Sequence, residues 1–339
     1  MHKTLLALLM IALSASALAV GDPAIPTLKY SAAGQDLNAL PAAEKDLPTV
    51  TAQPWFKVSD KLLQLEGPSF DRQGNLVLVE VFGGQVLKVD TQGKLQVLVA
   101  KNALGSAGLA IHKDGRLFVA GLGNFKDTGN LTVYDADGTN PQTVIGGNKG
   151  FLVDDLVFDA DGGFYFTDFK GTSTEPTGGV YYVTPDFKRI VPILPKLAIA
   201  NGIALSPDGK TLWVTEFATG LLHRIELKDA TTIAPFGEVI VYRFNGPSPD
   251  SMRVDQDGNL YVAQYSQGRV LVLNPNGTPI GQVLIPGRET GHFLRSTSLA
   301  IKPGTNELYL VSNDGDLGQG SVIFRARGFA KALPLYSHQ

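Results

Sequence analysis

The sequence of 339 residues contains no cysteine, which excludes disulfides, thiolate nucleophiles and zinc–thiolate sites. Histidine is also scarce. The five histidines are too few for a His-rich metal cluster. With 29 basic and 32 acidic residues the net charge is −3, and no basic stripe of the kind that binds nucleic acid is present. What the chain does have is 38 glycines and 20 prolines, a composition typical of many short strands and tight turns.

The first nineteen residues have the pattern of a secretory signal peptide. Lys3 precedes a short apolar run over residues 5–13, and Ala17-Leu18-Ala19 forms a small-residue cleavage site. The alternative is an uncleaved membrane anchor, but the run is too short for a bilayer core of about 30 Å. We therefore predict cleavage after Ala19, export to the periplasm or beyond, and no membrane span in the mature chain. Residues 20–54 lack clear periodicity and are interpreted as a leader lying on the surface.

A repeated unit fills the rest of the chain. Turns that are mostly of the type Asp-x-x-Gly begin at residues 71, 112, 159, 206, 255 and 302, so the spacing is 41 to 49 residues. Each turn lies between two β-rich stretches, and a third stretch usually follows. A period of 40–50 residues with three or four short strands is typical of a β-propeller blade. We predict an all-β, six-bladed propeller over residues 55–339, with segment 55–63 as the N-terminal strand that closes the ring. A stacked β-solenoid is the alternative.

One position of the repeat carries chemistry. Inner strands of a propeller run along its axis, so equivalent positions near their ends converge. The residue five before each turn is, in order, Glu66, Ala107, Asp154, Asn201, Asp250 and Thr297. Three carboxylates close together on an axis would repel one another unless a cation binds there, and the amide of Asn201 adds a fourth oxygen in the same register. Oxygen donors without cysteine or clustered histidine indicate a hard ion, and Ca²⁺ accepts such an irregular set best. The alternative is that these side chains cap turns or bind backbone groups.

An ion with an open coordination position can polarise a carbonyl oxygen, and a neighbouring carboxylate can act as general base or acid. No Gly-x-Ser-x-Gly elbow is present, so nothing indicates a covalent nucleophile. Metal-assisted hydrolysis of an ester or lactone fits best. The competing interpretation is a non-enzymatic binding module in which the calcium only stabilises the ring.

The residues around these positions resemble the SMP-30/gluconolactonase/LRE-like propeller family, and in places its bacterial drug-responsive calcium-dependent lactonases. The resemblance covers about residues 60–331. It rests on Leu65-Glu66-Gly67, Val153-Asp154-Asp155, Ala200-Asn201-Gly202-Ile203, Pro249-Asp250-Ser251, Gly178-Gly179-Val180-Tyr181-Tyr182-Val183 and Gly291-His292-Phe293-Leu294-Arg295-Ser296-Thr297.

The resemblance implies a hydrolase of small lactones, either aromatic ones of the dihydrocoumarin type or sugar lactones. It implies one catalytic Ca²⁺ held by Glu66, Asp154, Asn201 and Asp250, with Ser251 as a weaker ligand. Asp250 matches the family's proton-transfer residue, so two roles are expected of it.

Some members of the family carry a second, structural calcium. Asp127 and Gly129 match the first part of that pattern. The second part reads Gly146-Gly147-Asn148-Lys149, without a carboxylate and with a lysine, which leaves the second ion open. The signal peptide is another departure, because the close lactonases look cytoplasmic.

Aromatic residues follow several of the predicted strands and are candidates for an apolar wall at the channel mouth; core packing is the alternative for each. These residues are Phe125, Phe169, Phe217 and Tyr265. His292 lies in a glycine-flanked loop, where it can contact a substrate or stabilise a turn.

Overall fold

The computed structural model describes residues 38–246 and 248–339. The predicted signal peptide and most of the predicted leader lie outside these residues. No helix in the described part of the chain is long and apolar enough to cross a membrane.

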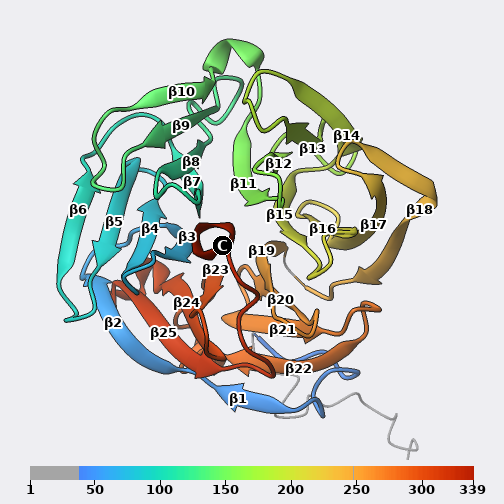
Figure 1. Cartoon of the computed structure of the whole chain (residues 1–339). Coiled ribbons are helices and arrows are strands. Elements are labelled where there is room, and N and C mark those ends of the chain that lie inside the picture. Colours follow the sequence, from blue (N-terminus) through green and yellow to red (C-terminus); the bar gives the residue numbers. More distant parts are fainter. Residues whose placement is uncertain (1–37, 247) are drawn as a thin grey trace, which may run out of the picture.

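Six antiparallel sheets surround a central axis, which confirms the predicted six-bladed propeller (Figure 1). Blade 1 consists of β3 (Leu65–Phe70), β4 (Leu76–Glu80), β5 (Gln85–Val89) and β6 (Leu95–Val99). Blade 2 consists of β7 (Ser106–Ile111), β8 (Leu117–Gly121), β9 (Asn130–Tyr134) and β10 (Gln142–Ile145). Blade 3 consists of β11 (Val153–Phe158), β12 (Phe164–Asp168), β13 (Gly178–Val183) and β14 (Ile190–Leu197).

Blade 4 consists of β15 (Ala200–Leu205), β16 (Thr211–Glu216), β17 (Leu221–Asp229) and β18 (Thr232–Arg243). Blade 5 consists of β19 (Pro249–Val254), β20 (Leu260–Gln264), β21 (Arg269–Leu273), β22 (Pro279–Leu284) and the added β1 (Thr49–Thr51). Blade 6 consists of β23 (Arg295–Ile301), β24 (Glu307–Asn313), β25 (Ser321–Arg327) and β2 (Gln53–Ser59). Four short 3₁₀ turns complete the elements: η1 (Gly147–Lys149), η2 (Arg288–Thr290), η3 (Gly315–Leu317) and η4 (Tyr336–His338).

The repeated turns form for a local reason. In the first of them the Asp71 carboxylate accepts the backbone N–H groups of Gln73 and Asn75, at 3.0 and 2.8 Å. Gly74 has φ +83°, a conformation that glycine adopts without strain. The turn therefore folds β4 back antiparallel to β3, and the same arrangement recurs around Asp255.

The ring closes between the two ends of the propeller. Strand β2 pairs antiparallel with β25, so an N-terminal strand is the outer strand of the last blade, as predicted. Strand β1 pairs parallel with β22. Just before β1, the buried Glu44 forms an ion pair with Arg269 and accepts a hydrogen bond from the Tyr242 hydroxyl. The leader residues around Glu44 and β1 are thus packed against blades 4 and 5, and its last two residues begin β2 of blade 6.

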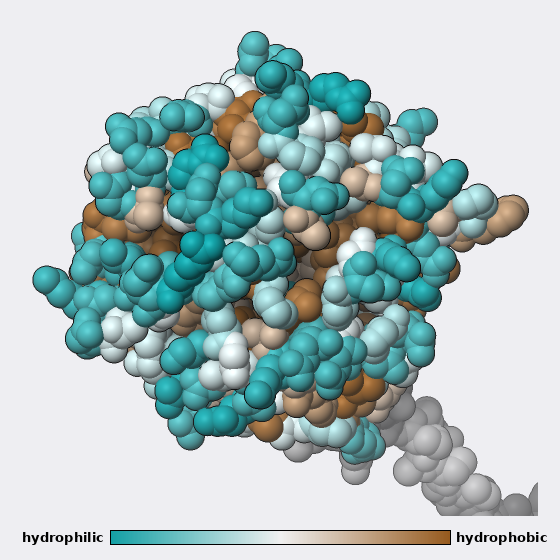
Figure 2. Space-filling model, viewed as in Figure 1, coloured by the Kyte–Doolittle hydropathy of each residue, from teal (hydrophilic) through white to brown (hydrophobic). Residues whose placement is uncertain are grey.

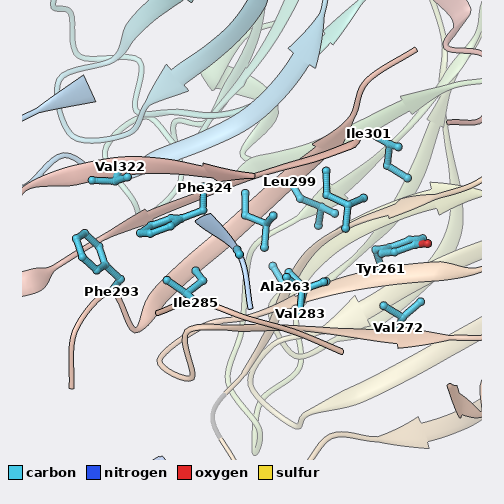
Figure 3. Close-up of a cluster of buried hydrophobic side chains, with 14 of the residues drawn as sticks. Tyr261, Ala263, Val272, Val283, Ile285, Phe293, Leu299, Ile301, Val322 and Phe324 are labelled. Carbon is cyan, nitrogen blue, oxygen red and sulfur yellow. The ribbon is translucent and has the colours of Figure 1, made fainter. Parts of the chain in front are cut away.

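Apolar side chains fill the interfaces between neighbouring blades. Between blades 5 and 6, Tyr261 and Val283 pack with Leu299 and Phe324 in one buried cluster (Figure 3). β-branched and aromatic residues suit these twisted, tightly packed sheets. This packing holds the blades in a ring without disulfides.

The C-terminal segment covers one end of the central channel, as Figure 1 shows. Tyr336 stacks on Phe158 with ring centroids 5.0 Å apart, and the Arg72 Nε donates to the Ser337 carbonyl oxygen at 2.6 Å. Both partners lie at or beside the Asp-x-x-Gly turns, so the covered end is the turn end. Most of the surface on the face viewed in Figure 1 is hydrophilic (Figure 2). The start of each inner strand lies at the opposite end, roughly 13 Å away along four residues of strand.

Candidate metal centre and active site

The six axial residues all lie on innermost strands, at the same irregularity of the pairing. In each blade the register between the first and second strands breaks at this position, for example between Val153 and Leu156 and between Pro249 and Met252. A β-bulge frees the chain from its ladder partner and re-aims a side chain, and bulges are common beside active sites.

The three predicted carboxyl ligands are buried and influence one another. Burial raises the pKa of Glu66 well above its usual value, and the nearby Asp250 and Asp154 carboxylates raise it further. Burial likewise raises the pKa of Asp154, followed by repulsion from Asp250. The pKa of Asp250 is raised chiefly by burial, against hydrogen bonds from Ser251 and Asn201 that favour the ionised form. Glu66, Asp154 and Asp250 therefore lie near enough to interact electrostatically, and Asn201 lies beside Asp250.

Asn201 provides the test of whether a cation fits. Its side chain donates to Asp250, while its buried Oδ1 accepts no hydrogen bond within residues 38–246 and 248–339. An orphaned buried oxygen is costly, and nearly all such atoms in proteins have a partner. An amide oxygen beside carboxylates is a donor set that suits Ca²⁺.

The side-chain positions do not by themselves form a closed cage. In the described part of the chain, no three His, Cys, Asp or Glu side chains lie close enough to bind one ion. The candidate set thus depends on the Asn201 oxygen in addition to the acids.

Ser251, next to Asp250, and the two remaining axial residues, Thr297 and Ala107, have other partners. The Ser251 N–H donates to Asp250 Oδ1 at 3.0 Å, which orients the Asp250 carboxyl. Thr297 Oγ1 donates to the Leu65 carbonyl oxygen at 2.6 Å, next to Glu66. Ala107 belongs to a small apolar cluster. Blades 2 and 6, which carry Ala107 and Thr297, therefore supply packing and support, whereas the other four blades carry the candidate ligands.

Glu66, Asp154 and Asp250 form what we call the acidic ring. The sequence analysis did not predict a charged pair that lies beside it. The buried Asp155 accepts a hydrogen bond from Arg253 Nη1 at 3.3 Å. Burial raises the pKa of Asp155, and the Arg253 guanidinium opposes that rise. The guanidinium compensates part of the negative charge along the axis. The sequence signal that could have revealed this pair is the second acid, Asp155, directly after Asp154.

The end of the channel at which Glu66, Asp154 and Asp250 lie is the acidic end. Three of the four predicted aromatic residues form a row there. Phe169, Phe217 and Tyr265 each follow directly after the second strand of their blade, with successive ring centroids 5.8 and 5.9 Å apart. Phe125 lies apart from this row and stacks on the exposed Phe82. The row runs along blades 3 to 5, and Phe169 also packs against the small apolar cluster that contains Ala107.

His292 is held by its neighbours. Its Nδ1 lies 2.9 Å from the buried Asp314 carboxylate, and Gln319 contacts the ring as well. These contacts give it a role in fixing the loop before blade 6.

The residues of the second calcium site, which the sequence left open, have other contacts. Asp127 Oδ1 accepts a hydrogen bond from the Asn124 amide at 2.9 Å. Gly129 packs so closely on Phe151 that a Cβ would lie 2.4 Å from its carbonyl oxygen. The facing segment carries Lys149 and no carboxylate, and the Lys170 ammonium donates to the neighbouring Gly150 carbonyl oxygen. A single carboxylate is a poor calcium site.

Comparison with known proteins agrees with this architecture. Residues 65–313 match the model of the SMP-30/Gluconolactonase/LRE-like region, and the chain belongs to this family. It is 51% identical over 316 residues to lactonase drp35 of Staphylococcus saprophyticus, covering 92% of this chain and 98% of the relative. It is 50% identical over 320 residues to lactonase drp35 of Staphylococcus aureus, covering 93% and 98%.

Solved structures share the fold. The calcium-binding protein regucalcin from Agrobacterium tumefaciens superposes with a TM-score of 0.69 at 19% identity, covering 85% of this chain and 99% of its own. A gluconolactonase from Xanthomonas campestris gives a TM-score of 0.66 at 20% identity, covering 83% and 96%.

Proposed function

We propose that this chain is a calcium-dependent lactonase that hydrolyses the ester bond of small lactones. The observation that carries the proposal is the buried acidic ring around the orphaned Asn201 oxygen. The high identity to relatives named lactonase, over almost the whole chain, supports the reaction class.

In this proposal Glu66, Asp154, Asn201 and Asp250 hold one calcium ion, with Ser251 as a weaker oxygen donor. When bound, the ion supplies Lewis-acid polarisation of the lactone carbonyl. A second ion at Asp127 and Gly129 is not part of the proposal, because that site lacks further carboxylates.

Asp250 moves the proton. One of its carboxylate oxygens takes a proton from the attacking water as the water oxygen bonds to the carbonyl carbon. The ring C–O bond then breaks, and the same oxygen returns the proton to the released alkoxide. The product is a hydroxy acid. The Ser251 N–H and the Asn201 amide keep the Asp250 carboxyl oriented between these two steps.

The substrate class follows from the wall of the mouth. Phe169 and Phe217 offer only ring faces and Tyr265 offers one hydroxyl, whereas a sugar lactone needs several polar partners. We therefore propose aromatic lactones in preference to sugar lactones.

The test is hydrolysis of dihydrocoumarin and of gluconolactone by residues 20–339, after chelation and again with Ca²⁺ restored. Turnover that depends on calcium, and is faster on dihydrocoumarin, is the expected result. If neither lactone turns over while calcium still raises the melting temperature, the protein is a binding module with a structural ion.

We also propose export, for which the support is the sequence pattern of residues 1–19. Mass spectrometry of the native protein should find an N terminus at Val20. A full-length chain in the cytoplasm would contradict this proposal.

A further inference from the structure

Two threonines occupy equivalent positions in consecutive blades. Thr167 on β12 and Thr215 on β16 each come one residue before the end of the second strand and are fully buried. Each lies opposite the bulge of its own inner strand, where two residues face one. A bulge leaves backbone groups without ladder partners, so those groups need other ones.

The threonine hydroxyls bind these groups and reach the next blade. Thr167 Oγ1 accepts the Asp155 N–H at 3.1 Å and donates to the Asn201 carbonyl oxygen at 2.6 Å. Thr215 Oγ1 accepts the Gly202 N–H at 2.8 Å and donates to the Asp250 carbonyl oxygen at 2.9 Å. The hydroxyls thus connect the backbones of three neighbouring ligand strands in series.

The two hydroxyls lie where the inner strands are closely packed. A Cβ on Gly202 would lie 2.5 Å from the Asp250 carbonyl oxygen, so the inner strands of blades 4 and 5 are already in close contact. When the repeats are aligned on their turns, the corresponding positions in the other four blades carry no hydroxyl; they are Val79, Ala120, Ala263 and Val311. In blade 6 the next residue, Ser312, has a hydroxyl, but it donates to the Phe293 carbonyl oxygen instead. The two hydroxyls therefore occur only where the following blade supplies Asn201 or Asp250.

We propose that Thr167 and Thr215 are positioning residues that set the spacing of Asp154, Asn201 and Asp250 for calcium. This inference rests on the proposed function, because it assumes that these three residues bind the ion. Partners behind the ligands commonly change metal affinity about 10- to 100-fold when they are removed.

The experiment measures calcium affinity by titration calorimetry on the chelated, purified chain. Thr167→Val and Thr215→Val keep the shape of the side chain and remove the hydroxyl. We expect each to weaken calcium binding about 10-fold or more. Thr167→Ser and Thr215→Ser keep the hydroxyl and lose a methyl group, so affinity should stay close to that of the unchanged chain while the melting temperature falls.

Thr132→Val is the matched control. Thr132 is a buried threonine on β9, and its hydroxyl donates to Asn130 Oδ1 in blade 2, where the axial residue is Ala107. Its replacement should leave calcium affinity unchanged.

Each outcome decides. Valine variants that bind calcium as tightly as the unchanged chain overturn the inference, and so do serine variants that lose as much affinity as the valine variants. If the valine variants do not fold, the serine variants decide: retained affinity supports the positioning role and reduced affinity overturns it. A failure of the unchanged chain to bind calcium would instead reject the proposed function.

Discussion

The two ends of the central channel are built on opposite principles. At the turn end, the Arg72 side chain donates to the Ser337 carbonyl oxygen of the C-terminal segment, and Tyr336 stacks on Phe158. At the other end, buried carboxyls raise one another's pKa and the Asn201 oxygen has no hydrogen-bond donor within the described residues. The first end stabilises the ring, whereas the buried and mutually repelling carboxyls of the second destabilise it. The difference therefore comes from the C-terminal segment at one end and from single side chains at equivalent blade positions at the other.

The largest effect should come from Asp250→Asn, which tests whether the acidic end is dedicated to chemistry. Loss of the proton carrier should lower kcat on dihydrocoumarin about 10²- to 10⁴-fold. The calcium-free melting temperature should rise, because one of the mutually repelling buried carboxyls is gone.

Rate assays and thermal melts in chelator measure both changes. Asp257→Asn, at an exposed turn, is the control and should change neither value. Retained activity in Asp250→Asn would remove the distinction between the two ends.

Tyr336→Ala tests the turn end. Removal of this largely buried ring should lower the free energy of unfolding by about 3 kcal/mol, while calcium affinity stays unchanged. Urea denaturation at saturating calcium gives the first value and calorimetry the second. Tyr336→Phe keeps the stack and should behave nearly as the unchanged chain. A parallel loss of calcium affinity would show that the ends are coupled.

Calcium and pH should act together on the acidic end. The folded-state pKa values of Glu66, Asp154 and Asp250 are raised, so the folded chain holds more protons than the unfolded chain above pH about 4. Without calcium, these groups therefore reduce stability increasingly as pH rises above that value. Calcium would take the place of these protons, so the increase in melting temperature on adding calcium should be larger at pH 8 than at pH 5. Melts with and without calcium measure this difference, and an equal increment at both pH values would contradict it.

The smallest effect should come from Phe217→Leu, which sharpens the role of the apolar wall. Loss of the aromatic contacts should lower kcat/KM for dihydrocoumarin roughly threefold and leave gluconolactone unaffected. Phe82→Leu replaces an exposed ring outside the row and serves as the control. A matching loss on both lactones would argue against aromatic selectivity.

The repeated unit made the fold and the positions of the candidate ligands predictable from the sequence. The Asp-x-x-Gly turns are local signals, because a carboxylate binds backbone groups only a few residues away. Counting five residues back from Asp159, Ser206 or Asp255 therefore located Asp154, Asn201 and Asp250. The ring-closing strand was predictable because the last blade lacked one.

Other features left no local signal. Thr167 and Asn201 are 34 residues apart, and their hydrogen bond depends on how two blades pack. The Asp155–Arg253 pair joins residues 98 apart. Nothing in the C-terminal residues by themselves indicates that they would cover the channel.

The sequence by itself determined that six similar units form a ring and that oxygen donors recur at one position in four of them, because both follow from short-range periodicity. Only the tertiary structure decided that the acidic end faces away from the C-terminal segment, that burial and proximity raise the carboxyl pKa values, and that two hydroxyls connect the ligand strands. Burial, repulsion and hydrogen bonds between blades depend on distances through space, which the order of residues along the chain does not specify.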